Sequence, residues 1–516
     1  MIKEPTAGAS VERVTAPAHT IYYYSIAYGN NSEMVERILA NRCWWKKAHP
    51  SILGKPVSNQ INTITVQFYW MMDIERFNMS KLNENSTSCL TKKSLNRFSH
   101  SDELSDKDNL FRNLWFMCQR EGLDVFEYVP LTYSFRMNEF QFEKDLQQFC
   151  RLFLANGQRK RLEEIKPIET YIDEKLCETT EVFYGFNFKR LPKNSGQRKF
   201  RNVSNGKVVK LKEFFFEKNI WIMKPSDCDR GKGVEIFKSL EELGKFLELY
   251  SSGYNMSEYM NMNYDDSDNI SPSLKEGGMV NKTYKTVFSK FVIQKYMEQP
   301  ALFKGYKFDI RAHAALTHDK KVYLFRDSYV RICSLPYNLE KTNYFGHLCN
   351  TSVNMKSNSF GQIAVGNTIS IVELAEFFDQ KEAGTDTHQK FGCNFEPYLF
   401  EEIKKLVKLS FDAVLSKKNL LNPENYPNSF ELFGFDIMVD QSYRCWLIEA
   451  NYIPGLTDED NDYLKAYLDR MMDDLFKITL DEIYPLPRNA KRKVQSYKFM
   501  DFPPDENLWK LVAKYE

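Results

Sequence analysis

The fold of this chain is decided by the sequence ELFGFDIMVD at residues 431–440, which is followed closely by WLIEAN at residues 446–451. Both runs are rich in apolar, aromatic and β-branched residues, and the polar residues between them are typical of a hairpin turn. The sequence therefore predicts two adjacent antiparallel strands.

Three polar side chains interrupt this apolar hairpin. A two-residue loop at residues 441–442 pairs Asp436 with Leu447. Glu449 and Asn451 then lie further along the second strand, on the same face as Asp436, because side chains alternate along a strand. Diagonal neighbours on one face lie within about 7–8 Å of one another, and a set of oxygen ligands suits Mg²⁺ better than zinc. The alternative is a strand pair with solvated acids, but the apolar surroundings favour burial.

Composition limits the class of protein. A chain of 516 residues with 43% hydrophobic and 27% charged residues is long enough for two or three globular lobes. The formal net charge of +1 leaves electrostatic binding to local patches. The 10 cysteines contain no CxxC pair, which argues against a disulfide framework or zinc ribbon and favours a reducing compartment. We find neither a signal peptide nor an apolar run of the ~20 residues that a membrane span requires.

Shifts in composition divide the chain into lobes. The segment between Lys189 and Lys212 contains nine basic residues and no acidic one. The predicted units are a flexible leader at 1–20, an N-terminal lobe at 21–188, a basic linker at 189–219, a central lobe at 220–300 with a disordered insertion at 251–285, a C-terminal catalytic lobe at 301–485, and a basic, aromatic tail at 486–516.

Local patterns predict the elements within these lobes. Strands are expected at 220–224, 234–237, 291–295, 307–316 and 322–326, and helices at 107–121, 137–155, 239 onward, 397–415 and 461–480. Ser239 and Glu242 have the spacing of a capping box. Residues 352–389 look irregular in large part.

Strand 307–311 carries charged residues at every second position. Lys307, Asp309 and Arg311 share one face, which is also the pattern of an ordinary exposed strand. Other features favour a site that binds phosphates. Lys224 ends an apolar strand before a glycine-containing turn, where backbone N–H groups can approach a phosphate. Arg331 adds a further cation. Neither a Walker loop nor a kinase signature is present.

These motifs occur in the order seen in the tubulin–tyrosine ligase-like family, which the chain resembles over roughly residues 95 to 485. The matching blocks are WIMKP at 221–225, RGKG at 230–233, VIQKY at 292–296, KFDIR at 307–311, HLCN at 347–350, FELFGFD at 430–436 and WLIEAN at 446–451. The resemblance implies an ATP-grasp fold, with α/β lobes that hold ATP and Mg²⁺ between β-sheets.

The resemblance also implies roles for individual residues. Catalysis would involve Arg311, Arg331, Asn350 and Glu449; ATP would contact Lys107, Lys224, Arg230, Gly231, Gly233, Gln294, Lys295, Tyr296, Met297, Lys307 and Asp309; and magnesium would be held by Asp436, Glu449 and Asn451. Cys349 departs from the threonine that is common in the family, so a hydroxyl donor is lost there.

The activity implied is ATP-dependent ligation of an amino acid, glutamate or glycine, to a side-chain carboxylate in an acidic tubulin tail. The expected partners are tubulin or microtubules, with no nucleic acid and no membrane, for a monomer in the cytoplasm, on the cytoskeleton or at a cilium or basal body. A binding protein that keeps the fold without turnover is the alternative. The basic linker would attract an acidic tail, although such a stretch is also compatible with simple solvation.

Overall fold

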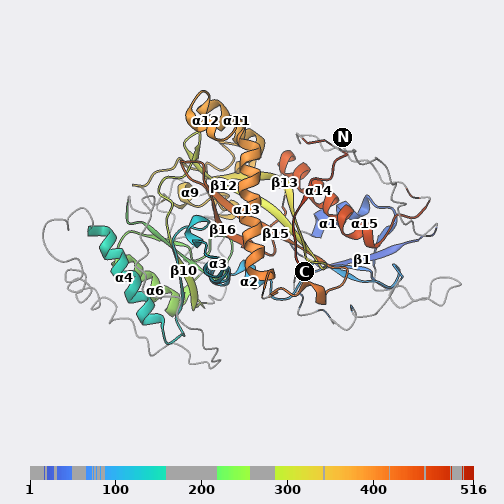
Figure 1. Cartoon of the computed structure of the whole chain (residues 1–516), viewed down its shortest axis with the longest axis horizontal. Coiled ribbons are helices and arrows are strands. Elements are labelled where there is room, and N and C mark those ends of the chain that lie inside the picture. Colours follow the sequence, from blue (N-terminus) through green and yellow to red (C-terminus); the bar gives the residue numbers. More distant parts are fainter. Residues whose placement is uncertain are drawn as a thin grey trace, which may run out of the picture.

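The structure is a computed structural model. It describes residues 20–27, 32–48, 65–72, 88–158, 218–255, 285–340, 343–417, 419–457, 461–488 and 505–516, together with residues 17, 29, 74, 77, 82, 490, 502 and 503. Nearly all of the predicted basic linker and of the leader, and most of the predicted insertion, lie outside these residues. Figure 1 shows an elongated molecule with β10 toward one end, β1 toward the other and the longest strands between them.

The central part is an antiparallel sheet of seven strands, counted within the described ranges. Its main order is β14-β13-β12-β15-β16, while β11 also pairs with β12 and β17 with β13. The strands are β11 (Leu302–Phe303), β12 (Tyr306–Thr317), β13 (Lys321–Ile332), β14 (Thr368–Ser370), β15 (Phe430–Val439), β16 (Cys445–Asn451) and β17 (Trp509–Lys514). Helices α3 (Lys107–Glu121), α11 (Ile371–Glu382) and α13 (Phe395–Leu415) pack their apolar residues against this sheet. β13 extends beyond the predicted strand at 322–326, and its second half is almost wholly buried.

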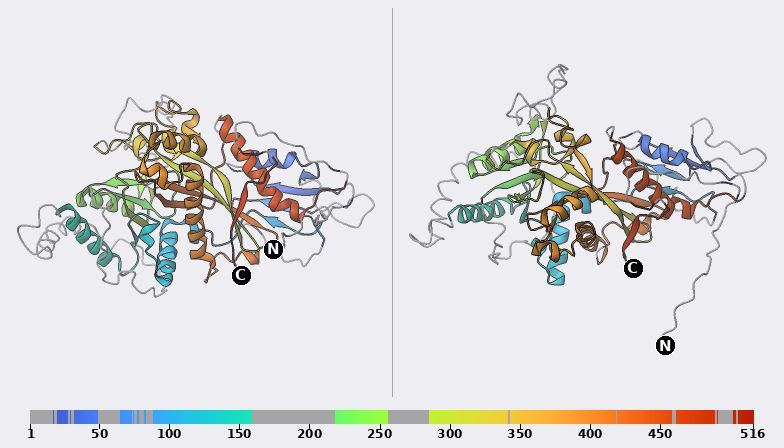
Figure 2. Two further views of the ribbon diagram at one scale, coloured as in Figure 1. Left: turned by 45° about the horizontal axis from the view of Figure 1, so that its top comes forward. Right: turned by 90° about the horizontal axis from the view of Figure 1, so that it is seen from above.

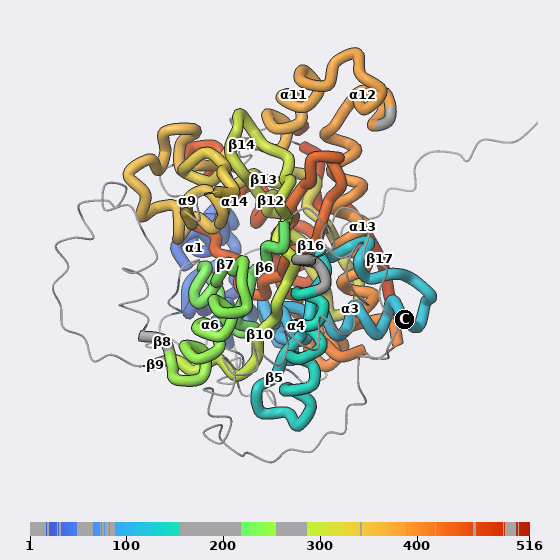
Figure 3. Tube along the Cα trace, turned by 90° about the vertical axis from the view of Figure 1, so that its left-hand side faces the viewer, coloured from blue at the N-terminus to red at the C-terminus, as the bar shows by residue number. Residues whose placement is uncertain are grey.

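A four-stranded sheet lies at one end, in the order β5-β10-β6-β7. Its strands are β5 (Thr132–Arg136), β6 (Trp221–Pro225), β7 (Glu235–Phe237) and β10 (Lys290–Lys295). Helices α4 (Phe142–Gln158) and α6 (Leu240–Ser252) share one aromatic core with it, and Figure 3 shows these elements from that end. The predicted capping box at the start of α6 is confirmed, with both of its hydrogen bonds present.

A second four-stranded sheet lies at the other end, in the parallel order β2-β1-β3-β4. It consists of β1 (Tyr22–Ile26), β2 (Trp45–Lys47), β3 (Phe68–Trp70) and β4 (Ser94–Leu95). Helices α1 (Ser32–Ala40) and α14 (Asp462–Ile478) complete its core, so the apolar face of α14 is buried inside the protein. Figure 2 shows the molecule in two further views.

The remaining elements are short. They are α2 (Asp102–Ser105), α9 (Tyr344–His347), α10 (Thr351–Asn354), α12 (Asp386–Lys390), α15 (Leu480–Ile483), the pair β8 (Tyr254–Asn255) and β9 (Lys285–Thr286), and single 3-10 turns at Val125–Glu127, Val365–Asn367 and Pro423–Asn425. No helix in the described ranges has both the length and the apolar character needed to cross a membrane.

The hairpin register differs from the prediction. Val439 pairs with Cys445 across the five residues 440–444, among which Tyr443 adopts a left-handed φ of 63°. That register continues to the pair Ile437–Leu447, and the ladder then shifts by one residue, so that Asp436 pairs with Glu449. The predicted pairing of Asp436 with Leu447 was wrong because neither the αL residue nor the bulge is visible in the alternation of side chains. The outcome places the two acids directly opposite one another.

Other predictions were wrong in part. Residues 352–389 are not largely irregular, since β14, α11 and α12 lie within them. The ends of the predicted insertion are ordered, because α6 extends to Ser252 and β8 pairs with β9. β5, which was assigned to the N-terminal lobe, joins the central lobe's sheet, and β17, from the predicted tail, joins the large sheet.

Candidate functional site

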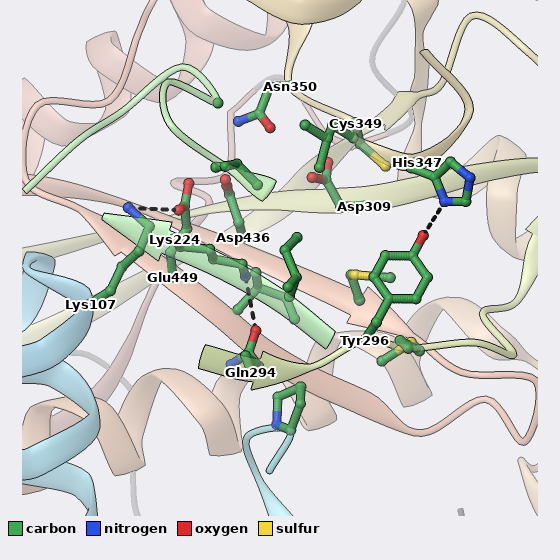
Figure 4. Close-up of a pocket in the computed structure, with 18 of the residues that line it drawn as sticks. Lys107, Lys224, Gln294, Tyr296, Asp309, His347, Cys349, Asn350, Asp436 and Glu449 are labelled. Atoms are coloured by element: carbon green, nitrogen blue, oxygen red, sulfur yellow. Dashed lines mark hydrogen bonds and ion pairs between the residues drawn. The ribbon is translucent and has the colours of Figure 1, made fainter. Parts of the chain in front are cut away.

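A pocket opens between the β5-β10-β6-β7 sheet and the large sheet. Its volume is about 780 Å³, including the open mouth. Figure 4 shows side chains from both sheets, from the start of α3 and from the segment after α9 converging on it. The predicted site residues that line it are Lys107, Lys224, Arg230, Gly231, Gln294, Lys295, Tyr296, Met297, Lys307, Asp309, Asn350, Asp436 and Glu449.

The two carboxylates of the hairpin meet at one side of the pocket. Asp436 is buried on β15, and Glu449 lies opposite it on β16. Their carboxyl groups are in contact. The side-chain amide of Asn451 donates a 3.3 Å hydrogen bond to Glu449 Oε1. Two carboxylates in contact repel one another when both are ionised, and a cation relieves that repulsion.

Two buried arginines surround Asp436. Arg311, from β12, donates from Nε and Nη2 to its two oxygens, and Arg331, from β13, lies 2.7 Å from Asp436 Oδ2. Arg331 also forms a two-pronged pair with Asp309, at 2.7 and 2.6 Å. Burial raises the pKa of Asp436, but the two guanidinium groups more than offset this and hold that pKa below its usual range. Asp436 is therefore ionised, and its position is fixed from two strands.

Lys224 supplies a buried ammonium on the opposite sheet. Its Nζ donates a 2.9 Å hydrogen bond to Gln294 Oε1, and Gln294 in turn donates to Thr132 Oγ1 at 2.9 Å. Desolvation lowers the pKa of Lys224 to about 8. An anion that enters the pocket raises the pKa of such a lysine and favours its charged form, because the anion's negative charge compensates for the hydration that burial removed.

Lys307 lies at the other end of the pocket. Its Nζ donates to Tyr296 Oη at 2.8 Å and to the backbone oxygen of His347 at 2.9 Å, while His347 Nδ1 lies 2.7 Å from Tyr296 Oη. Burial lowers the pKa of Lys307. The sequence analysis did not predict that His347 contacts Tyr296 and Lys307. The available signal was its position as the first residue of the HLCN motif.

Lys107 is the first residue of α3 and reaches the pocket from the helix end. Its Nζ donates to the backbone oxygen of Cys228 at 2.7 Å and lies 3.4 Å from Glu449 Oε2. The helix that carries it begins where the sequence predicted. Lys107 thus connects Glu449 with the glycine-containing turn at residues 225–233, called the glycine turn below.

The glycine turn forms one rim of the pocket. Arg230, Gly231 and Gly233 all have positive φ, and the side chain of Arg230 is 56% exposed. A Cβ at Gly231 would lie 2.8 Å from Val353 Cγ2, and one at Gly233 would lie 2.7 Å from Pro225. Both positions therefore require glycine for space as well as for conformation.

The expected adenine-binding segment follows β10. The side chain of Lys295 turns away from the pocket, toward Glu298 and the backbone oxygens of Lys218 and Ile220. Its backbone N–H is also occupied, by Leu131 O. Among the described residues, the Met297 N–H has no hydrogen-bond partner and remains free for a ligand.

Some of the predicted site residues do not line the pocket but lie behind the residues that do. Arg311, Arg331, Asn451 and Gly233 do not line the pocket, and act through the neighbours described above. The sequence analysis did not predict the apolar residues that line the pocket, which are Pro130, Ile222, Val234, Leu348, Met438 and Ile448. No signal distinguishes these residues from core residues in the sequence, because both kinds are apolar residues in or near strands.

The fit to a magnesium ion rests on oxygen chemistry. No group of three or more His, Cys, Asp or Glu side chains in the described ranges is arranged around one point as metal ligands. The candidate set is instead two carboxylates in contact and one amide. Such a set fits Mg²⁺, which keeps several waters and takes one or two carboxylates plus phosphate oxygens.

Comparison with known proteins extends this picture. A sequence model of the tubulin-tyrosine ligase family matches residues 187–492, which is more than half of the chain. The family has an ATP-grasp fold, in agreement with the sheets and helices described above.

The sequence identity to individual relatives is low. The chain is 28% identical to a tubulin glycylase 3D of Tetrahymena thermophila over 274 residues, 28% identical to a probable alpha-tubulin polyglutamylase of the same organism over 245, and 26% identical to a probable tubulin–tyrosine ligase of Saccharomyces cerevisiae over 285. These alignments cover 51%, 46% and 52% of this chain, but only 21%, 48% and 34% of the relatives. On the strength of the family match, the chain belongs to the tubulin–tyrosine ligase family.

Proposed function

We propose that this protein is an ATP-dependent ligase that joins glutamate or glycine to a side-chain carboxylate of another protein, with glutamate in a tubulin tail as the acceptor. The observation that carries the proposal is the pocket itself, in which Lys107, Lys224 and Lys307 surround a space bordered by Asp436 and Glu449. Cations for phosphates beside oxygen ligands for a metal are the parts that phosphoryl transfer requires.

In the proposed reaction, an acceptor carboxylate oxygen attacks the γ-phosphorus of ATP. ADP leaves and an acyl phosphate forms. The amino group of the incoming amino acid then attacks the acyl carbon, phosphate leaves, and the nitrogen loses a proton as the amide bond forms. No enzyme nucleophile is required for this ligation, so Cys228, Cys333 and Cys349 are given no covalent role in it.

The cations would share the negative charge of the transferring group. Lys224 would reach the phosphates from β6 and Lys107 from the start of α3, while Lys307, at the Tyr296 end of the pocket, would contact phosphate or substrate from β12. Each fixed charge of this kind stabilises a transition state by about 3 kcal/mol. Asp436, Glu449 and Asn451 would hold Mg²⁺, which would neutralise charge on the phosphoryl oxygens. Arg311 and Arg331 would keep Asp436 in place.

The nucleoside would lie toward the Tyr296 end of the pocket. The free N–H of Met297 would read the adenine edge, and Ile222 and Met438 would pack against its faces. Asp309 would lie near the ribose. Arg230, Gly231 and Gly233 would cover the phosphates and exclude water, which otherwise hydrolyses an acyl phosphate. Asn350, which lies beside Gly231, would contact the reacting groups from the same rim.

The relatives' names support the choice of donors to test. These name glycylation, polyglutamylation and tyrosine ligation, so glycine and glutamate are the first donors to test. The proposed partners are tubulin or microtubules, for a monomer that acts on the cytoskeleton in the cytoplasm or a cilium, without nucleic acid or membrane.

The test uses purified protein, taxol-stabilised microtubules, ATP and labelled glycine, glutamate or tyrosine. We expect ATP-dependent incorporation of one label, with binding to microtubules that weakens as salt increases. Omission of ATP, and microtubules whose acidic tails have been removed by subtilisin, are the controls.

The second candidate is a tubulin-binding protein without turnover. The observation that favours it is Cys349, a buried thiol in contact with Cys333 at the position where a hydroxyl donor is expected. Good sedimentation with microtubules and no incorporation of any label would support this candidate and contradict the ligase.

A further inference from the structure

Two cysteines touch one another beside the pocket. Cys333 follows the last residue of β13 and is fully buried, and Cys349 lies between α9 and α10 and is 6% exposed. Their sulfur atoms are 3.5 Å apart. A disulfide requires about 2.05 Å, so a shift of about 1.5 Å, shared between two short segments, would close the bond.

The pair is reached from one side only. Cys349 is part of the pocket lining, and Figure 4 shows its sulfur beside Asp309, whereas Cys333 does not line the pocket. A small oxidant that enters the pocket therefore meets Cys349 first, with Cys333 behind it as the resolving thiol. A nucleotide in the same space would block this approach.

The pair also adjoins groups that the proposed reaction uses. The Cys333 N–H donates to Lys307 O at 2.9 Å, and Lys307 Nζ donates to His347 O, two residues before Cys349. Asn350 immediately follows Cys349. A bond between the two sulfurs would pull the segment that carries His347 and Asn350 toward β13, and would change the end of the pocket where Lys307 lies.

We propose that Cys333 and Cys349 form a reversible disulfide that inactivates the pocket when peroxide reaches it in the absence of nucleotide. The Cys349 thiolate attacks one oxygen of hydrogen peroxide, the O–O bond breaks, and water leaves after protonation, giving a sulfenic acid. The Cys333 sulfur then attacks the Cys349 sulfur, the S–O bond breaks, and a second water leaves. Two thiols and one peroxide become one disulfide and two waters, and a dithiol reductant reverses the change.

The experiment treats the full chain with hydrogen peroxide, with and without ATP. Peptide mapping under non-reducing conditions should find the 333–349 cross-link, and ATP should slow its formation at least about tenfold, since an occupied site is shielded in proportion to its occupancy. Because burial raises the pKa of the Cys349 thiol, formation should also speed up as the pH rises. Binding of a fluorescent ATP analogue should fall with cross-linking and return with dithiothreitol.

Two variants make the result specific. Cys333→Ser removes the resolving thiol, so no 333–349 cross-link should form and binding of the analogue should survive the same brief treatment. Cys43→Ser, which removes an exposed thiol elsewhere, should behave like the wild type.

The proposal is overturned if no 333–349 cross-link forms, if ATP gives no protection, or if the cross-linked protein binds the analogue as well as the reduced protein does. None of these outcomes depends on ligation. They therefore leave the proposed function to its own test.

Discussion

The two sides of the pocket are built differently. On the large sheet, Asp436 is buried and bonded by two arginines from neighbouring strands. On the glycine turn, Arg230 is 56% exposed, and its ion pair within the described ranges is a 3.8 Å contact with Asp229. The sheet therefore carries charges that the fold itself needs, while the turn carries charges that are available to a ligand. Substitutions on the sheet should change both stability and binding, and those on the turn should change binding more than stability.

Asp436→Asn should have the largest effect. It keeps the shape of the side chain but leaves Arg311 and Arg331 without their shared carboxylate. We expect a loss of about 3–5 kcal/mol in the free energy of unfolding, as for a broken buried ion pair, and no incorporation of label. Urea denaturation and the labelling assay measure the two effects. Unchanged stability would contradict the structural role assigned to the sheet.

Lys224→Met should separate binding from stability on the central lobe. Burial of the ammonium is costly, so the variant should be no less stable than the wild type at neutral pH, while affinity for ATP falls at least about tenfold with the loss of a phosphate-binding charge. Isothermal calorimetry provides the comparison, and Lys245→Met, at an exposed position on α6, is the matched control.

The same lysine predicts a dependence on pH. Its folded pKa of about 8 lies below the usual value, so the ammonium form decreases as the pH rises through 8. ATP affinity should therefore fall between pH 7 and pH 9 in the wild type and fall less in Lys224→Met. Stability should change in the opposite direction, because the unfolded state binds more protons between pH 8 and 10.5 and the folded state gains as the pH rises. Parallel pH profiles for the two proteins would contradict this assignment.

Gly231→Ala tests the turn. The new Cβ would meet Val353 at 2.8 Å with a φ of 72°, which costs about 1–2 kcal/mol locally. We expect several-fold weaker ATP binding and a small change in stability. Gly384→Ala is the control, because that glycine also has positive φ but has open space around it. Equal effects of the two changes on ATP binding would show that strain, and not position over the pocket, is responsible.

Arg230→Ala should have the smallest effect. The side chain is exposed, so the melting temperature should not change, while ATP affinity falls a few-fold at low salt and less at high salt. Thermal scans and titrations at two salt concentrations provide the check. A large drop in melting temperature would remove the contrast between the two sides of the pocket.

The sequence predicted the parts that depend on local pattern. Helix α3 begins at Lys107 as expected, the capping box at Ser239 is present, and alternation along β12 placed Lys307 and Asp309 in the pocket. These succeed because a helix cap and a strand face are set by residues close in sequence.

Features that depend on distant contacts could not be predicted. The bulge beside Asp436 shifts the hairpin register and sets Glu449 opposite it, yet alternation alone gives no sign of the shift. The pairing of β5 with β10, and of β17 with β13, joins segments far apart in the chain. Pairings of this kind follow from the packing of whole lobes, which a local pattern does not encode.

The central claim is that Asp436, Glu449 and Asn451 provide a magnesium site beside the phosphates of ATP. The most direct test measures ATP affinity with and without Mg²⁺ in the wild type, in Glu449→Gln and in the exposed control Glu376→Gln. We expect Mg²⁺ to strengthen ATP binding in the wild type and the control, and to have little effect in Glu449→Gln, which should also lose incorporation of label while still sedimenting with microtubules. An unchanged Mg²⁺ effect and unchanged labelling in Glu449→Gln would contradict the account.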